Sequence, residues 1–188
     1  MYRHFTVAPR GLRTEEDIGV VRTFKPQSIP KRKGFNKSLA EVITKQVLER
    51  RFDLDEIKRV APNAKHPLFN DVPCDYGPRM GNQLEGCVEI LKKDKYSRRA
   101  KITLSRPDDE IPPCIMEIQF FVRGDGFNYR PFVITIAYMR SWDLNLGMPY
   151  DVHLFQALGD YVANALNIPQ GGVIVFAGSA HTYFQVGT

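Results

Sequence analysis

Cys114 is the strongest candidate for a reactive residue in this sequence, because of the residues that surround it. It follows Pro112 and Pro113 and precedes a strand-like run from residue 115 to 122. A cysteine thiolate can add to an electron-poor carbon, although a lone cysteine is more often a small buried hydrophobic residue. No base lies beside Cys114 in the sequence, so we expect arginines brought near by the fold to activate it.

A second polar cluster begins at Arg140 and Ser141, where another strand-like run ends. An adjacent guanidinium and hydroxyl can bind one phosphate through charge-assisted hydrogen bonds. Asp151 follows in the same segment, and its carboxyl group can accept a hydrogen bond and, when protonated, donate one. Asp151 also precedes a helical pattern, so its position equally suits a helix N-cap.

Taken together, these features resemble the thymidylate synthase superfamily, whose members attach a one-carbon unit to C5 of a pyrimidine nucleotide. The resemblance extends from Tyr76-Gly77 through Cys114 and the Arg-Ser-x-Asp-x-x-Leu-Gly-x-Pro-x-Asp segment to a His-x-Tyr pair ending at residue 183. It implies that Cys114 adds to C6 of the base. It further implies that Arg140 and Ser141 bind the phosphate. His181 and Tyr183 would contact the sugar, and Asp143 would contact the pterin of a folate.

The same resemblance implies a homodimer. Ser97-Arg98-Arg99 matches, in type and order, the arginine pair that a partner subunit donates to the phosphate in this superfamily. The alternative for Arg98 and Arg99 is ordinary surface charge. The implied fold is α+β, a thymidylate-synthase-like mixed sheet with flanking helices, with one face of the sheet buried between two subunits.

Asp151 matches the position where thymidylate synthases carry an asparagine that contacts uracil, and aspartate here is typical of cytidylate hydroxymethylases. A carboxyl group can accept from the cytosine amine and donate to N3, whereas an amide complements uracil. We therefore expect a hydroxymethyltransferase acting on CMP or dCMP. Its co-substrate would be 5,10-methylenetetrahydrofolate, not retained as a prosthetic group. His181 and Tyr183 suit ribose and deoxyribose alike, so the sugar stays open.

The end of the sequence favours the same product. The chain stops at Thr188, whereas thymidylate synthases continue with a tail that closes over the folate. Without such closure we expect water, rather than a hydride, to reach the methylene intermediate on the base. Two alternatives stay open: a divergent thymidylate synthase that methylates dUMP, and a catalytically silent nucleotide-binding relative.

Glu41 is the candidate for the family's general-base glutamate, because it precedes Tyr76 by roughly the family's spacing. Ser38-Leu39-Ala40-Glu41 also fits a helix capping box, in which Glu41 has a purely structural role. The identity of the general base therefore stays open between these interpretations.

The elements expected around these residues form an α+β sheet protein. Residues 1 to about 35 are polar and proline-punctuated, so we expect irregular chain there with at most one short strand. Residues 52–80 contain four prolines and predict a long connection with little regular structure. The remaining pattern predicts helices from Ser38, over 82–93 and after Asp151, and strands at 100–104, 115–122, 132–139 and 173–176.

Composition limits the class of protein. The 188 residues suit a single domain, with the 43% hydrophobic and 25% charged content of an ordinary globular chain. No apolar run is long enough to span a membrane and the N-terminus does not resemble a secretory signal, so we expect a cytoplasmic protein. Three cysteines without a Cys-x-x-Cys spacing and four scattered histidines predict no metal site.

Much of the positive net charge of +5 lies in residues 31–33 and 92–99. Solvated surface is the simpler interpretation of these clusters, and steering of an anionic nucleotide is the alternative. Aromatic residues do not interleave with the charges as a base-stacking surface requires, so we expect no nucleic-acid partner.

Overall fold

The computed structural model describes residues 4–62, 75–124 and 130–184. The elements are, in chain order, β1 (His4–Val7), the 3₁₀ helix η1 (Pro9–Gly11), β2 (Thr14–Phe24), α1 (Lys37–Leu48), α2 (Leu54–Val60), α3 (Tyr76–Met80), α4 (Gln83–Lys93), β3 (Lys101–Thr103), β4 (Ile115–Arg123), β5 (Phe132–Asp143), α5 (Met148–Leu166) and β6 (Gln170–Tyr183). Within the described ranges, no helix has both the length and the apolar character needed to cross a membrane.

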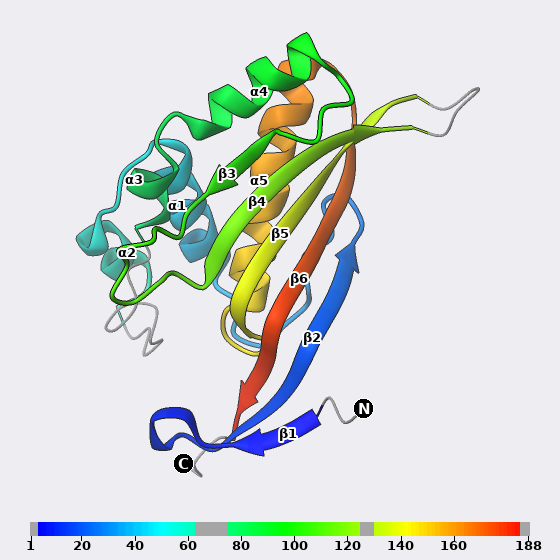
Figure 1. Cartoon of the computed structure of the whole chain (residues 1–188). Coiled ribbons are helices and arrows are strands. Elements are labelled where there is room, and N and C mark those ends of the chain that lie inside the picture. The colour runs from blue at the N-terminus through cyan, green and yellow to red at the C-terminus, as the bar shows by residue number, and fades with distance from the viewer. Residues whose placement is uncertain (1–3, 63–74, 125–129, 185–188) are drawn as a thin grey trace.

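The strands form one six-stranded sheet in the order β1-β2-β6-β5-β4-β3 (Figure 1). β5 and β6 are parallel and are joined by α5, whereas the other neighbouring pairs are antiparallel. A parallel pair needs a long crossover connection, which α5 provides. This arrangement confirms the predicted α+β fold with a mixed sheet and flanking helices.

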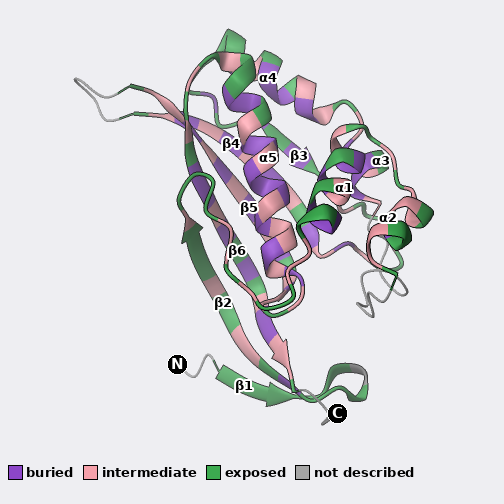
Figure 2. Cartoon of the chain, turned by 180° about the vertical axis from the view of Figure 1, so that it is seen from behind, coloured by how far each residue is buried: buried purple, intermediate pink, exposed green. Residues whose placement is uncertain are grey.

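Helices α4 and α5 cover one face of the sheet, as the views from the two sides show (Figure 1, Figure 2). Along β5 the buried residues alternate with half-buried ones, the pattern of a strand with one face on a core. Gly159 allows α5 to approach this face closely, because a Cβ there would lie 2.5 Å from Thr135 Oγ1. The main core therefore lies between α5 and the central strands.

The opposite face of the sheet carries apolar side chains on neighbouring strands. Tyr138 of β5 stacks on Phe176 of β6 with ring centroids 5.5 Å apart, and Val21 of β2 is paired with Phe176. Phe176 is 40% exposed and Val21 is 53% exposed. Contiguous exposed apolar surface of this kind often marks a protein-binding face.

The N-terminal residues depart most from the predicted fold. We expected irregular chain, but β2 is an 11-residue strand that pairs with β6 along its length. Most β2 side chains are exposed or half-buried, so the sequence lacks the alternation that predicts a strand. Backbone pairing rather than burial forms β2. The same pairing extends β6 to 14 residues, well beyond the predicted 173–176.

Two helices begin earlier than predicted, and both capping predictions are wrong. The cap of α1 is Asn36, whose Oδ1 accepts a hydrogen bond from the Leu39 N–H at 3.1 Å. Glu41 is therefore not part of a capping box. α5 begins at Met148, so Asp151 lies inside the helix and not at its N-cap.

The other predicted elements are largely confirmed. α4, β3 and β4 lie where the sequence places them, and β5 continues past residue 139 to Asp143. Helical spacing predicts buried positions for both Cys87 and Tyr161. Cys87 is buried in the core, whereas Tyr161 of α5 is 39% exposed. The connection over 52–80 is less irregular than expected, because it contains α2 and α3; its residues 63–74 lie outside the described part.

Candidate active site

Strand direction brings the predicted reactive segments to one end of the sheet. β4 is antiparallel to β5, and β5 is parallel to β6, so the start of β4 lies beside the ends of β5 and β6. Ile115 pairs with Met139, and Asp143 pairs with His181. Only four residues separate the end of β5 from the start of α5, which lies at the same end of the sheet.

Cys114 lies immediately before β4, where the strand pairing becomes irregular. Its side chain is half-buried and packs against the core. Its carbonyl oxygen accepts a hydrogen bond from the Arg140 N–H at 3.0 Å, and a register shift follows between Ile115 and Glu117. Such bulges occur often beside active sites, where they redirect side chains. Cys114 is thus held by its backbone, and the residue as a whole is half-buried.

The guanidinium of Arg140 lies over the loop that leads to Cys114. Its Nη2 and Nε donate to the Pro112 carbonyl at 2.8 and 3.0 Å, and Nε also donates to the Pro113 carbonyl at 3.2 Å. A guanidinium has five N–H donors, so an exposed arginine with these contacts can still bind a phosphate.

Ser141, His181 and Tyr183 form a second cluster at the ends of β5 and β6. Ser141 Oγ lies 3.5 Å from His181 Nδ1, and the His181 and Tyr183 rings meet edge-on with centroids 5.1 Å apart. His181 is 8% exposed. β6 lies between β2 and β5, so these are not residues of an edge strand.

Asp143 and Asp151 lie on either side of the turn between β5 and α5. Asp143 Oδ1 accepts hydrogen bonds from the N–H groups of Asn145 and Leu146, both at 2.8 Å. Gly147 follows, and a Cβ on it would lie 3.2 Å from Asp151 Oδ2. The turn therefore holds the Asp143 carboxylate in one orientation and brings Asp151 close to it.

The environment of Asp151 favours its neutral form. Burial raises the pKa of Asp151 to about 8; the nearby Trp142 indole opposes this rise, and the negative charge of Asp143 adds to it. The Trp142 N–H makes no hydrogen bond of ordinary geometry within the described part of the chain. At neutral pH the Asp151 carboxyl is therefore mostly protonated and can donate a hydrogen bond.

Asp151 borders a pocket formed by α1, α2, α3 and α5. The lining is mostly apolar and consists of Ile43, Gln46, Val47, Arg51, Phe52, Ile57, Tyr76, Tyr150, Asp151 and Leu154. Glu41 is exposed on α1 and forms an ion pair with Lys37 at 3.3 Å. The structure therefore does not bring Glu41 into this pocket, and it places Gln46 there instead.

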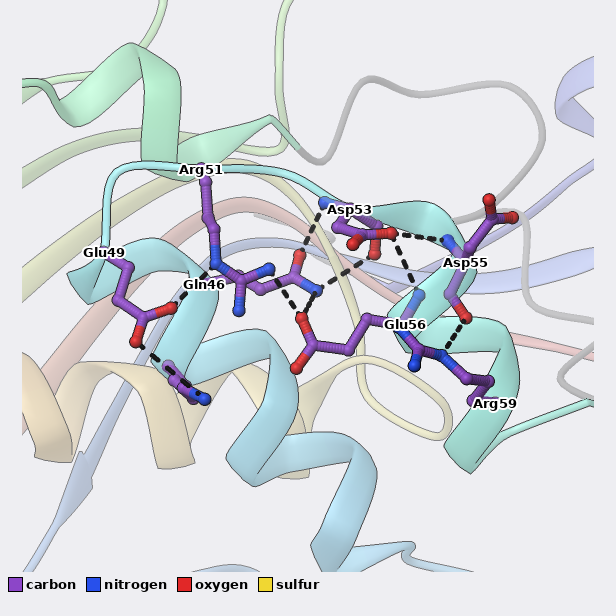
Figure 3. Close-up of polar contacts among 8 residues, drawn as sticks. Gln46, Glu49, Arg51, Asp53, Asp55, Glu56 and Arg59 are labelled. Carbon is purple, nitrogen blue, oxygen red and sulfur yellow. Dashed lines mark hydrogen bonds and ion pairs between the residues drawn. The ribbon is translucent and has the colours of Figure 1, made fainter.

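Gln46 was not singled out from the sequence, and its amide is held by three hydrogen bonds (Figure 3). Its Oε1 accepts from the Asp53 N–H at 2.9 Å, and its Nε2 donates to the Asp53 carbonyl and to Glu56, both at 3.0 Å. Glu56 also accepts from Arg51 Nη1 at 2.5 Å. Hydrogen bonds from Arg51 and then Gln46 lower the pKa of Glu56, so this carboxylate is ionised. The sequence signal was a polar residue within the apolar stripe of α1.

Arg98 and Arg99 do not meet Arg140 within one chain. Both are exposed in the segment between α4 and β3, and the Arg98 carbonyl accepts from Gln119 Nε2 at 2.7 Å. Gln119 lies five residues along β4 from Cys114, which is about 16 Å at the usual rise of a strand. Their predicted part in phosphate binding thus requires a second subunit and stays a proposal.

The basic cluster at residues 31–33 lies close to this end of the sheet. Arg32 and Lys33 line an open hollow together with Asn145, Leu146, Tyr183 and Phe184. Tyr183 belongs to the cluster with His181, and Asn145 to the turn that Asp143 closes. This location favours steering of an anionic ligand over the interpretation of the cluster as solvated surface alone.

Comparisons with known proteins agree with this geometry. The family model described as thymidylate synthase matches residues 37–186. Thymidylate synthase of Agaricus bisporus is 28% identical over 119 residues, which are 61% of this chain and 40% of that protein. Thymidylate synthase of Saccharomyces cerevisiae is 30% identical over 128 residues, 64% of this chain and 41% of that protein.

A structural relative extends the match to nearly the whole chain. The crystal structure of thymidylate synthase from T4 phage has a TM-score of 0.76 at 20% identity, covering 98% of this chain and 73% of that one. At this identity the likeness shows the fold alone. The matches to the two fungal proteins span about two fifths of the length of those relatives.

Proposed function

This chain belongs to the thymidylate synthase family, and on that premise we propose that it transfers a one-carbon unit to C5 of a pyrimidine nucleoside monophosphate. The preferred substrate in this proposal is cytidylate, CMP or dCMP, and the product is its 5-hydroxymethyl derivative. The residues that would do this work are those gathered at the end of β5 and β6 and at the start of β4.

The covalent steps begin at Cys114. Its sulfur adds to C6 of the base, and the electron pair of the C5–C6 double bond moves to C5, which takes up the one-carbon unit. C5 then loses its proton to a general base as the bond between the new carbon and the folate nitrogen breaks, which leaves an exocyclic methylene on the base. Water adds to this methylene to give the hydroxymethyl group, and elimination of the Cys114 sulfur restores the C5–C6 double bond. Arg140 and Ser141 hold the phosphate while His181 and Tyr183 hold the sugar, so that the ring lies against the sulfur.

The one-carbon unit comes from 5,10-methylenetetrahydrofolate in this proposal. Asp143 would contact the pterin of that co-substrate. The residue suits this role because two turn N–H groups hold its carboxylate in a fixed orientation, and a fixed carboxylate is a good acceptor for ring N–H groups.

Asp151 is the observation on which the choice of cytosine rests. A protonated carboxyl can accept from the exocyclic amine of cytosine and donate to N3, which gains basicity as the thiol adds. The raised pKa of about 8 keeps the needed proton on Asp151 at neutral pH. The N-cap of α5 is Gly147, so capping of this helix does not occupy a carboxyl oxygen of Asp151.

Uracil is the second candidate base, and two observations favour it. The relatives with the strongest likeness quoted above are named thymidylate synthase. In addition, a protonated carboxyl complements uracil when its proton lies on the other oxygen, because it then donates to O4 and accepts from N3–H. Methylation of dUMP is therefore the alternative activity.

A homodimer completes the proposal. Support comes from the exposed apolar face that includes Tyr138 and Phe176, and from the separation of Arg98 and Arg99 from Arg140 within one chain. A second subunit packed on this face could bring its own Arg98 and Arg99 to the phosphate.

The test is to incubate the protein with CMP, dCMP, UMP or dUMP and 5,10-methylenetetrahydrofolate, and to measure the mass of each nucleotide product. A hydroxymethyl adduct on a cytidylate is the expected result. A methyl adduct on dUMP alone would replace the proposal with its alternative. Cys114→Ser is the control, because it removes the nucleophile and should abolish any product while leaving nucleotide binding intact.

A further inference from the structure

The loop that carries Cys114 is held by a second arginine as well as by Arg140. This loop joins β3 to β4, and Arg140 fixes its last residues through the Pro112 and Pro113 carbonyls. Arg79, on α3, fixes its beginning: Nη1 donates to the Leu104 carbonyl at 3.0 Å and to the Asp109 carboxylate at 2.8 Å. The loop is therefore bound to the rest of the fold at both ends.

The contacts of Arg79 are buried and directional. The Arg79 and Asp109 side chains are 7% and 8% exposed. Arg79 Nε also donates to Asp75 at 2.7 Å, and Asp109 accepts from the Arg106 N–H at 2.7 Å. The Arg106 N–H, with a further contribution from Arg79, holds the pKa of Asp109 below its usual range despite burial.

A buried ion pair is a costly way to hold two segments together. Desolvation of both charges offsets most of their attraction, so apolar residues would stabilise the same contact as well or better. A guanidinium adds a fixed geometry, because its planar donors bind acceptors in set directions. The arrangement is therefore better explained by placement of the loop than by stability.

α3 also forms part of the pocket beside Asp151. Tyr76 lines that pocket, three residues before Arg79 on the same short helix. Gly77 presses against the end of α1, since a Cβ there would lie 2.5 Å from the Arg51 carbonyl oxygen and 2.9 Å from that of Gln46. The same helix thus contacts the Asp151 pocket on one side and the Cys114 loop on the other.

We propose that Arg79 and Asp109 are positioning residues that set the Cys114 loop relative to the pocket of Asp151. They touch no substrate; they act through the loop. The inference rests on the proposed function only for its effect on turnover. Its structural part, control of the Cys114 sulfur, holds whatever the substrate is.

The test compares Asp109→Asn, which keeps an acceptor for the Arg106 N–H but removes the charge, with Arg79→Lys. Iodoacetamide labels the full-length protein, and mass spectrometry follows the Cys114 and Cys87 peptides separately. Alkylation of Cys114 should accelerate by about fivefold in Asp109→Asn, because loosening the loop exposes a half-buried sulfur. Arg79→Lys keeps the charge and should give a smaller change, and it also serves if Asp109→Asn does not fold.

Two controls separate placement from general loosening. Cys87 is buried in the core, where burial raises its pKa to about 12, so it reports global opening. Glu89→Gln makes the same acid-to-amide change at an exposed residue paired with Lys92. Acceleration at Cys114 alone supports the proposal. Equal acceleration at both cysteines, or none at Cys114 in folded variants, overturns it.

Steady-state kinetics with the nucleotide distinguish a failure of the positioning role from a failure of the proposed function. With the preferred nucleotide, kcat of Asp109→Asn should fall by about tenfold with KM changed less than about threefold, since displaced reacting groups slow chemistry more than binding. Absence of turnover and of nucleotide protection of Cys114 in the unmodified protein would refute the proposed function alone. Normal kcat in Asp109→Asn would refute the positioning role.

Discussion

The guanidinium of Arg140 and the carbonyl of Pro112 are joined by two hydrogen bonds, 2.8 Å from Nη2 and 3.0 Å from Nε. The residue expected to bind phosphate thus also holds the loop that presents the nucleophile. If Arg140 binds the phosphate as proposed, phosphate binding and placement of the Cys114 sulfur are coupled through one side chain.

Arg140→Lys should separate these two roles. A lysine keeps the positive charge but cannot donate to Pro112 and Pro113 from a planar fork. We expect nucleotide affinity to fall by about tenfold, the loss of one charge-assisted hydrogen bond, and kcat to fall as well. Isothermal titration and steady-state kinetics measure the two effects. Arg59→Lys is the matched control, because Arg59 also donates to a backbone carbonyl, that of Asp55, but is exposed on α2. Equal losses in both variants would contradict the coupling.

Asp151→Asn should shift base preference from cytosine toward uracil. The amide donates to O4 and accepts from N3–H, whereas it cannot supply a proton to N3 of cytosine. Turnover of cytidylate should fall by about a hundredfold or more, the usual contribution of a general acid, while turnover of dUMP rises. Competition between dCMP and dUMP, read by product mass, measures the shift. A variant that loses both activities equally would contradict a role in base selection.

Asp151 should also make the protein less stable as the pH rises from about 4 to 8. Its folded-state pKa of about 8 lies above that of an unfolded aspartate, so the folded protein binds more protons in this range. Stability then decreases with pH, by at most about 1.4 kcal/mol per unit. Urea denaturation at pH 5, 6.5 and 8 should show that Asp151→Asn lacks this part of the decrease. Parallel curves for the two proteins would refute the raised pKa.

The sequence indicated where the candidate site residues lie better than it indicated the bounds of the elements around them; the roles of these residues stay predictions. Cys114, Arg140 and Asp151 lie in a motif whose spacing reflects strand ends, so their approach to one end of the sheet followed from strand order. Pro149 in the first turn of α5 was a sequence signal for the true helix start, because proline is favoured there. The N-cap alternative for Asp151 depends on an aspartate that precedes an apolar stripe, a pattern that fits a helix start as well.

The residues that sequence reasoning missed act through contacts distant in the chain. β2 exists because β6 pairs with it, and neither strand alone carries a clear alternation. Gln46 looks like one polar residue in an apolar stripe until Asp53 and Glu56 fold back on it. Arg79 and Asp109 are 30 residues apart, and nothing local distinguishes them from surface charge. Periodicity predicts which face of an element is buried but not which buried polar groups meet.

Gly77→Ala should destabilise the protein and disturb the pocket of Asp151. A Cβ at residue 77 would lie 2.5 and 2.8 Å from Arg51 backbone atoms, which cannot move without shifting the end of α1. We expect a loss of about 1–3 kcal/mol in the free energy of unfolding, the usual cost of overpacking. Gly86→Ala is the control: it is also helical, but a Cβ there meets nothing within 4 Å. That variant should gain about 0.5–1 kcal/mol, because alanine favours the helix. Chemical denaturation measures both, and equal effects would show that the contact at Gly77 is relaxed.

The exposed sheet face should hold two subunits together, and the active site should be shared between them. Phe176→Lys places a charge beside Tyr138 on that face and should give a monomer by sedimentation, whereas Tyr161→Lys, at a side chain of similar exposure on α5, should not.

Mixing two inactive variants tests directly whether the site is shared between subunits. Neither Cys114→Ser nor the double variant Arg98→Ala/Arg99→Ala is expected to turn over alone. After subunit exchange in equal amounts, half of the dimers are mixed, and each of these has one site with an intact cysteine and intact donated arginines. Recovered activity should therefore approach about a quarter of that of the unmodified protein. No recovery would mean that the arginines act within their own chain, and turnover by the double variant alone would mean that they have no role. In either case the separation of Arg98 from Arg140 would need another explanation.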